Sequence, residues 1–184
     1  RSISYCPIQD QDEGFELVVS HEAGGHGLAK LADEYINYSL SIPNDVYDHY
    51  HAMQEYGWYK NVDFTHSPEF VKWSRFLVDD RYADEDLGVY EGACTYAYGA
   101  WRPSRTSIMR SENTGYNAPS REAIYYTIHK LAYGDEWQYD YEEFVRFDKQ
   151  SQAAGHAVVH HRTKKNPNTP ERVPAPPVFM GEIR

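Results

Sequence analysis

The chain has 184 residues, a net charge of −10 and 41% hydrophobic residues, which is enough for one domain with a substantial core. No apolar run approaches the roughly 20 residues that a membrane-spanning helix needs. The acidic balance argues against nucleic acid as a partner, because such binding draws on clustered Lys and Arg. The chain starts at Arg1 without the basic and apolar segments of a signal peptide, so we expect upstream sequence to lie outside it.

The first expected helix runs from Phe15 to about Leu31. It contains both histidines and the first glutamate of the motif HEAGGHGLAKLADEY, which spans residues 21–35. Imidazole nitrogens and carboxylate oxygens are common zinc ligands, and a catalytic zinc site keeps one position open for water. A glutamate next to the first ligand can take a proton from that water, as in the His-Glu-x-x-His metallopeptidases. The motif therefore predicts a catalytic metal site with Glu22 as the general base.

The two histidines of this motif are spaced irregularly. Four residues advance a helix by about 400°, which brings two side chains onto one face, whereas the five residues from His21 to His26 advance it by about 500°. A wide turn with an i→i+5 hydrogen bond would bring the two rings together again, and Gly24 and Gly25 would tolerate unusual dihedral angles there. We therefore predict a π-bulge at Ala23–Gly25.

The third ligand is expected from the acidic pair that follows. On a straight helix Asp33 would lie roughly 10 Å beyond His26 along the axis, too far to share a metal ion. The helix must therefore end soon after His26, where Gly27 would permit a break, and the chain must fold back. Asp33 is the first choice for the third ligand and Glu34 is the alternative.

Cap residues and the spacing of apolar residues predict the later helices, and alternating aromatic residues predict strands. We therefore expect a helix-rich fold with minor strands. In chain order, we expect a turn at 41–45, a helix capped by Asn44 or Asp45 that runs to about Trp58, a helix over 67–77, an acidic loop at 79–86, short irregular strands within 88–101, a helix that starts at Pro119 and ends before Gly134, a helix from Asp140 to about Ala154, and an extended proline-rich tail from Asn166.

A second, weaker metal candidate lies near the end of the chain. His156 and His160 have the i, i+4 spacing of one helix face, and His161 follows them. However, Gly155 and the β-branched pair at 158–159 favour a strand or loop, and no carboxylate is close by in sequence.

A Ser-x-Met sequence, Ser107-Ile108-Met109, follows the turn at 102–104. A single methionine more often fills a core than performs a function. Downstream of a His-Glu motif, however, this sequence resembles the Met-turn of metzincin peptidases, in which a methionine lies beneath the metal-binding histidines as an apolar floor.

Taken together, the chain resembles the IgA-peptidase-type zinc metallopeptidases, a family known from gut bacteria. The matching segments occur in the order of the family: HEAGGH with LADEY (21–35), YEGACTYAYGAWRPS (90–104), SIMR (107–110) and APSREAIYYTIHKLAYG (118–134). The chain departs from the family in two ways. The family more commonly spaces its histidines by four, and Ala29 stands where a glycine usually follows the second histidine.

The resemblance implies a zinc-dependent peptidase that hydrolyses peptide bonds of a polypeptide substrate, which would be immunoglobulin or another host or dietary protein. It makes His21, His26 and Asp33 the zinc ligands, Glu22 the general base and Met109 the Met-turn residue. Two tyrosines are candidates for contacting substrate and stabilising the oxyanion, namely Tyr98 and Tyr116.

The resemblance also implies an α+β, helix-rich fold, namely the catalytic half of a metzincin with its active-site helix, Met-turn and C-terminal helices. The sheet subdomain that precedes the active-site helix in metzincins would be largely absent. We therefore expect residues 1–165 to be the C-terminal metallopeptidase domain of a longer protein, whose missing N-terminal part would be a partner, and residues 166–184 to be the tail. An extracellular or cell-surface location follows, and with it a Cys6–Cys94 disulfide, since no other cysteines compete.

A competing interpretation is a binding module that has lost catalysis. The wider histidine spacing and Ala29 would then describe a degenerate site that holds metal structurally, while the 17 tyrosines and 4 tryptophans bind protein or glycan. The presence of Glu22 favours the enzyme, because a structural zinc site needs no free carboxylate beside its ligand.

Overall fold

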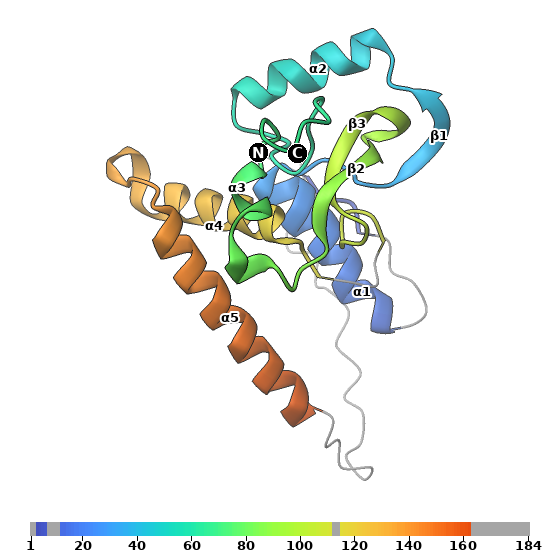
Figure 1. Cartoon of the computed structure of the whole chain (residues 1–184). Helices are drawn as coiled ribbons and strands as arrows, with labels where there is room; N and C mark the ends of the chain where they lie inside the picture. The colour runs from blue at the N-terminus through green and yellow to red at the C-terminus, as the bar shows by residue number, and fades with distance from the viewer. Residues whose placement is uncertain (1–2, 7–11, 112–114, 163–184) are drawn as a thin grey trace, which may run out of the picture. The chain divides into compact units, whose positions relative to one another are not determined.

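The computed structural model describes residues 3–6, 12–111 and 115–162, and Figure 1 shows how its elements follow one another. The chain divides into two compact units, Arg1–Phe144 and Val145–Arg184, and the residues of the candidate site belong to the first. The expected tail at 166–184 lies outside the described residues, and the expected domain at 1–165 remains a prediction. No helix of the described part is long and apolar enough to cross a membrane.

Helices and a small sheet both occur, so the fold is α+β as expected. The elements in chain order are α1 (Asp12–Val19), the π-helix η1 (Ser20–Ala29), β1 (Ile36–Ser41), α2 (Asn44–Glu55), α3 (Ser74–Leu77), the 3₁₀ turn η2 (Asp80–Tyr82), β2 (Leu87–Ala93), β3 (Thr95–Ser104), α4 (Ala118–Tyr133), the 3₁₀ turn η3 (Gly134–Glu136) and α5 (Tyr141–Arg162).

The sheet has the strand order β1-β3-β2, with β3 antiparallel to β2 and parallel to β1. The β2–β3 hairpin turns at Cys94 and Thr95, whose φ angles of 54° and 70° lie in the left-handed region. The backbone N–H of Cys94 donates to the carbonyl of Asp33 at 2.8 Å. The hairpin turn therefore fixes the backbone at the residue expected to be the third ligand.

Two buried clusters lie on either side of the segment that follows η1. Ala29 and Leu31 belong to the first cluster, together with Met109, and Ala32 belongs to the second, together with Cys94. Neighbouring residues of one short segment thus pack into different clusters, which leaves the chain little freedom at the positions just before the expected ligand.

The predicted bounds of α4 are confirmed. The side chain of Asn117 caps the helix by accepting from the N–H of Ser120 at 3.1 Å, and the helix ends at Gly134, which has a φ of 71°. The predicted cap of α2 is wrong, because Pro43 occupies the cap position and no side chain caps this helix. The helix also ends earlier than expected, at Glu55.

Only the last four residues of the helix predicted over 67–77 are helical, as α3. The N–H of Lys72 donates to Oδ2 of Asp63, and the indole N–H of Trp73 donates to the carbonyl of Gly88 at 2.7 Å, so tertiary bonds hold this segment. The strand β1 was not expected, since its pairing with β3 depends on residues far away in sequence. The predicted strand or loop around His156 is also wrong, because α5 continues to Arg162; the side chains there lie outside the described residues.

Candidate metal centre

The π-bulge predicted at Ala23–Gly25 is confirmed, and it is longer than predicted. The whole of η1, ten residues from Ser20 to Ala29, is π-helix. Because a π-helix bonds residue i to i+5, residues five apart return to nearly the same face. The ring centroids of His21 and His26 accordingly lie 4.8 Å apart.

Two of the three glycines of η1, Gly24 and Gly25, allow close approach of other side chains. A Cβ on Gly24 would lie 2.6 Å from the hydroxyl of Tyr116, and one on Gly25 would overlap the sulfur of Met109. Neither glycine has a positive φ. Gly24 and Gly25 therefore matter to η1 as predicted, but for another reason. They make room for the side chains of Tyr116 and Met109 and do not adopt unusual dihedral angles.

The break in the helix lies at Lys30 and not at Gly27. Lys30 has a φ of 56° and a ψ of 38°, which is left-handed, and its N–H and that of Leu31 both donate to the carbonyl of Gly25. A non-glycine residue rarely adopts this conformation. Here the bond from the Lys30 ammonium to the carbonyl of Gly27, at 2.7 Å, accompanies the turn. Ala29 does not prevent the chain from folding back.

This fold-back brings the three expected ligands together. Nε2 of His21 lies 3.2 Å and Nε2 of His26 lies 3.0 Å from the same oxygen, Oδ1 of Asp33. The other ring nitrogens are held by the backbone, since Nδ1 of His21 and Nδ1 of His26 each lie 2.8 Å from a carbonyl, of Ile108 and Leu31 respectively. In the neutral tautomer with Nδ1–H donating to the carbonyl, each Nε2 has a lone pair for a metal ion; in the protonated ring the same Nε2 donates to Asp33.

The donor atoms of His21, His26 and Asp33 all lie within 4.8 Å of one another, so the three residues form a possible metal-binding triad. Two ligands at about 2.1 Å from a tetrahedral zinc ion lie about 3.4 Å apart. The measured separations of 3.0 and 3.2 Å are close to that value. Within the described part of the chain, this is the one group of three such residues.

Asp33 and the two histidines shift one another's pKa values. Burial alone would lower the pKa of both imidazoles, but the hydrogen bond to Asp33, the charge of Asp33 and the bond to a backbone carbonyl together outweigh it, so both pKa values lie above the ordinary 6.5. Burial would raise the pKa of Asp33, but the hydrogen bonds from the two imidazoles lower it to about 2. Asp33 is therefore ionised at neutral pH, as a metal ligand must be.

Glu34, the alternative third ligand, has a different position. Its side chain is fully buried, and its carboxylate accepts hydrogen bonds from the hydroxyl of Ser107 at 2.6 Å and from the amides of Asn61 at 2.9 Å and Asn117 at 3.2 Å. Burial raises the pKa of Glu34 in spite of these bonds. The geometry thus selects Asp33 and gives Glu34 a structural role between three segments.

Met109 packs against η1. Its side chain is fully buried against Gly25, and its carbonyl accepts from the N–H of Glu34 at 2.8 Å. The residue before it, Ile108, supplies the carbonyl that holds His21. The chain turns here, because the carbonyl of Ser107 accepts from the N–H groups of residues 110 and 111.

Glu22 lines two cavities, each of which is also lined by one histidine of the triad. The first, of about 310 Å³, is also lined by His26 and Trp58, and the second, of about 270 Å³, by His21 and Tyr35. Such concave spaces beside a possible metal site can hold a small molecule or parts of a peptide. Glu22 is therefore placed beside both histidines and beside whatever occupies these cavities.

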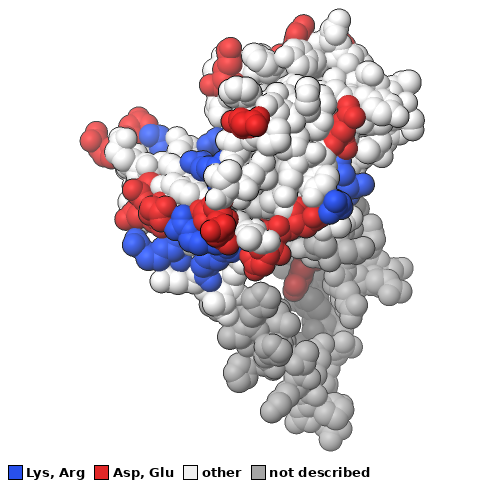
Figure 2. Space-filling model, in the orientation of Figure 1, with Lys and Arg blue, Asp and Glu red and all other residues white. Residues whose placement is uncertain are grey.

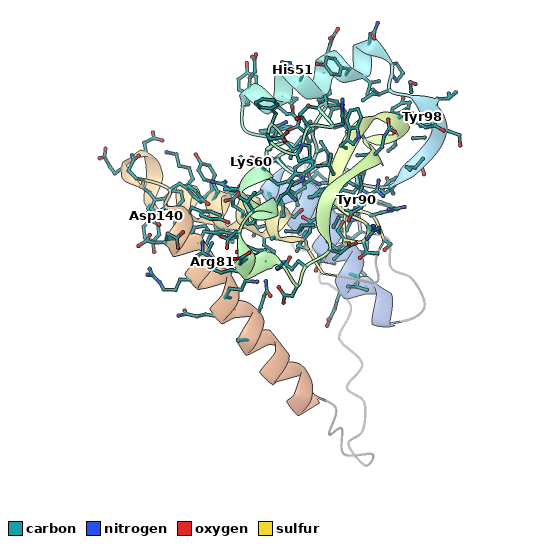
Figure 3. All side chains as sticks on the ribbon, viewed as in Figure 1. His51, Lys60, Arg81, Tyr90, Tyr98 and Asp140 are labelled. Carbon is teal, nitrogen blue, oxygen red and sulfur yellow. The ribbon has the colours of Figure 1, made fainter. Side chains whose placement is uncertain are left out.

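Of the two tyrosines singled out in the sequence, neither is brought to the triad. The hydroxyl of Tyr116 donates to the carbonyl of Ser20, and burial raises the pKa of this tyrosine to about 12. Tyr98, labelled in Figure 3, is 54% exposed on the central strand β3, and its described contacts do not include the triad.

Tyr35 is the residue that the sequence analysis missed. Its ring stacks on that of His21, with centroids 6.4 Å apart and an angle of 25° between the planes. Burial, the charge of Asp33 and a hydrogen bond between its hydroxyl and Asp33 raise the pKa of Tyr35 to about 12. The sequence could have indicated this neighbour, since Tyr35 lies two residues after the expected ligand Asp33 in the same motif.

The expected Cys6–Cys94 disulfide is absent, because both cysteines are free. Cys94 is enclosed in the second buried cluster, where its thiol and the hydroxyl of Tyr50 form a hydrogen bond. The N-terminal segment that carries Cys6 is held instead by Ser4, whose hydroxyl donates to the carbonyl of Glu22 at 3.1 Å.

Comparison of the chain with models of known protein families and with characterised proteins found no match. The function must therefore be argued from the geometry and chemistry of the triad and its cavities.

Proposed function

We propose that this chain is a zinc-dependent peptidase of the metzincin type, which hydrolyses peptide bonds of polypeptide substrates. The observation that carries the proposal is the convergence of Nε2 of His21 and Nε2 of His26 on one oxygen of Asp33, at 3.2 and 3.0 Å. Glu22 lies next to the first ligand and lines both adjoining cavities.

The donor set of two imidazoles and one carboxylate fits zinc better than magnesium or calcium, which take mainly oxygen ligands. A bound zinc ion would lower the pKa of a coordinated water to about 7 and polarise the scissile carbonyl. Three protein ligands leave a position open for that water, which is the pattern of a catalytic rather than a structural zinc site.

Glu22 is the residue proposed to move protons. Its carboxylate would take a proton from the attacking water and then give it to the amine that leaves when the peptide bond breaks. It is half-buried on the walls of both cavities and makes no ion pair in the described part of the chain. A carboxylate in this position is free to act on water and substrate alike.

Tyr35 and residues 107–111 would keep the ligands in place. Tyr35 stacks on His21 and hydrogen-bonds to Asp33, and the carbonyl of Ile108 orients the ring of His21. Outer partners of this kind fix the tautomer and direction of metal ligands. The contact of Met109 with Gly25, in the helix that carries both histidines, supports the proposed Met-turn.

The resemblance to the IgA-peptidase-type metallopeptidases is part of the same proposal. It rests on the motif at 21–35, on SIMR at 107–110 and on the residue roles they imply. The five-residue histidine spacing, which departs from the commoner family form, is accommodated by the π-helix η1. A protein substrate such as immunoglobulin is proposed from the resemblance alone.

The test is Glu22→Gln in the full-length protein, assayed on a mixed peptide library with and without a chelator. The variant should keep about one equivalent of zinc, as expected for a single catalytic site, and should lose about 10²–10⁴-fold in hydrolysis. Glu16→Gln is the matched control, since Glu16 is an exposed residue of α1 and should leave hydrolysis unchanged.

Full activity in Glu22→Gln would contradict the mechanism. A parent protein that cleaves no peptide with zinc bound, but binds a protein or glycan, would instead support the competing interpretation of a binding module.

A further inference from the structure

A cavity of about 330 Å³ lies among residues that belong to neither cavity beside the triad. Its lining includes three basic side chains, Lys60, Lys72 and Arg75, and one acidic side chain, Glu122. The chain as a whole carries a net charge of −10, so an excess of positive charge in one cavity is unusual here. Figure 3 labels Lys60 in the segment that follows α2, close to α3 and α4.

Two of the three basic side chains have carboxylate partners. Arg75 pairs with Glu122 at 2.6 Å, and Lys72 pairs with Asp63 at 3.0 Å. Glu122 is further occupied, because it accepts a hydrogen bond from the hydroxyl of Tyr139. Figure 2 shows basic and acidic side chains intermixed over the region of α3.

Lys60 differs from the other two. Its ammonium lies 3.7 Å from the centre of the ring of Tyr126, and no carboxylate in the described part of the chain forms an ion pair with it. Burial lowers the pKa of Lys60, with Glu122 acting against this shift and Arg75 acting with it. A partly desolvated cation beside another cation is costly unless an anion accompanies it.

A cation–π contact with Tyr126 alone does not explain why the Lys60 ammonium is half-buried in a cavity. An exposed lysine can lay its stem on an aromatic ring while its ammonium stays in water, and a cation–π contact at such a site contributes modestly. Lys60, however, is half-buried and lines a cavity that also holds Arg75 and the start of α4 at Pro119. The amino end of a helix carries partial positive charge, which adds to the preference for an anion.

We propose that this cavity binds a small organic carboxylate, with the Lys60 ammonium paired to the carboxylate group. One unpaired ammonium matches a singly charged group better than a phosphate dianion, since the fork of Arg75 is engaged by Glu122. The rings of Tyr126 and Tyr139 supply an apolar wall for the body of the ligand. The volume is at the lower end for ligand pockets, which favours a small molecule over a polymer.

The test uses benzoate as the carboxylate probe, with benzamide as its neutral counterpart of the same shape and inorganic phosphate as the competing anion. Binding to the full-length protein is followed by calorimetry or NMR titration at constant ionic strength. Benzoate should bind at millimolar concentration or below, and Lys60→Gln should weaken it by about tenfold or more, as for the loss of a charge-assisted hydrogen bond.

Lys130→Gln is the matched control, because Lys130 lies on α4 one turn after Tyr126 but pairs with Asp135 and does not line the cavity. It should leave benzoate binding unchanged. A second measurement needs no variant: benzoate should protect Lys60, and not Lys130, from acetylation by acetic anhydride in the parent protein.

The proposal is overturned if benzoate does not bind, if benzamide binds equally well, or if phosphate binds more tightly. Equal benzoate affinity in Lys60→Gln and in the parent would also overturn it, as would unchanged acetylation of Lys60.

Discussion

Each candidate ligand of the triad is also held by a backbone group, which for His21 and Asp33 comes from a distant part of the chain. The ring of His21 is held by the carbonyl of Ile108, and the ring of His26 by the carbonyl of Leu31. Asp33 is held through its own carbonyl, which accepts from the N–H of Cys94. Rings and carboxylate that are oriented before the metal arrives lose less freedom on binding it.

The two cysteines should differ in reactivity. Burial raises the pKa of the Cys94 thiol, which is enclosed and hydrogen-bonded to the hydroxyl of Tyr50. Cys6, in contrast, is partly exposed. Since the thiolate is the reactive form, iodoacetamide should modify Cys6 roughly a hundredfold faster than Cys94 in the native protein. Peptide mass spectrometry after timed labelling measures both rates, and labelling in urea should make them similar. An intact disulfide, or equal rates without urea, would contradict the free thiols described here.

At the scale of elements, the site depends on a π-helix and a left-handed turn. The histidine spacing predicted the π-bulge, because only a wide turn returns His26 to the face of His21. The turn at Lys30 was not predictable, since nothing in its residue type favours a positive φ. It is held by hydrogen bonds to the carbonyl of Gly25 and by Leu31, which packs into the first buried cluster.

The same distinction holds for the rest of the fold. The bounds of α4 follow from local signals, namely the cap at Asn117 and Gly134 at the end, and were predicted. Most of the helix expected over 67–77 is not helical because bonds from Lys72 and Trp73 to distant residues override local propensity. The choice between Asp33 and Glu34 also depended on distant partners of the buried carboxylate, which no local pattern reveals.

The contact between η1 and Met109 should be sensitive to one added methyl group. A Cβ on Gly25 overlaps the Met109 sulfur, so Gly25→Ala should destabilise the protein by about 1–3 kcal/mol, although alanine favours helix. Met109→Ala should cost about 2–5 kcal/mol by leaving a cavity. Because the new methyl group partly fills that cavity, the double variant should lose less than the sum of the two.

Urea unfolding measures all three variants. Gly115→Ala is the control, because a Cβ at Gly115 meets no atom within 4 Å and should change the free energy of unfolding little. Strict additivity of Gly25→Ala and Met109→Ala would show that the two positions are not in contact.

At the scale of the whole molecule, the triad couples the pH dependence of stability to that of the proposed metal binding. In metal-free protein the pKa values of His21 and His26 are raised above 6.5, in spite of burial, by their hydrogen bonds to Asp33. Their contribution to stability is therefore complete below pH 6.5 and is lost as the pH rises through the raised values. The pKa of Asp33 is lowered from 3.8 to about 2, so its contribution is present above pH 3.8 and is lost as the pH falls towards 2.

Bound zinc would reverse this dependence, because it would bind the imidazoles only after they lose their protons. Asp33→Asn, which removes the shared carboxylate charge, should therefore destabilise chelator-treated protein more at about pH 5 than at about pH 8. With saturating zinc the order should invert, since the parent then gains stability from bound metal mainly at the higher pH. Urea unfolding of parent and variant at both pH values, with and without zinc, gives four differences in the free energy of unfolding. Because parent and variant share the rest of the chain, the effect of the overall charge of −10 largely cancels in each difference. A pH-independent difference without zinc would mean that the carboxylate of Asp33 is not coupled to the two histidines.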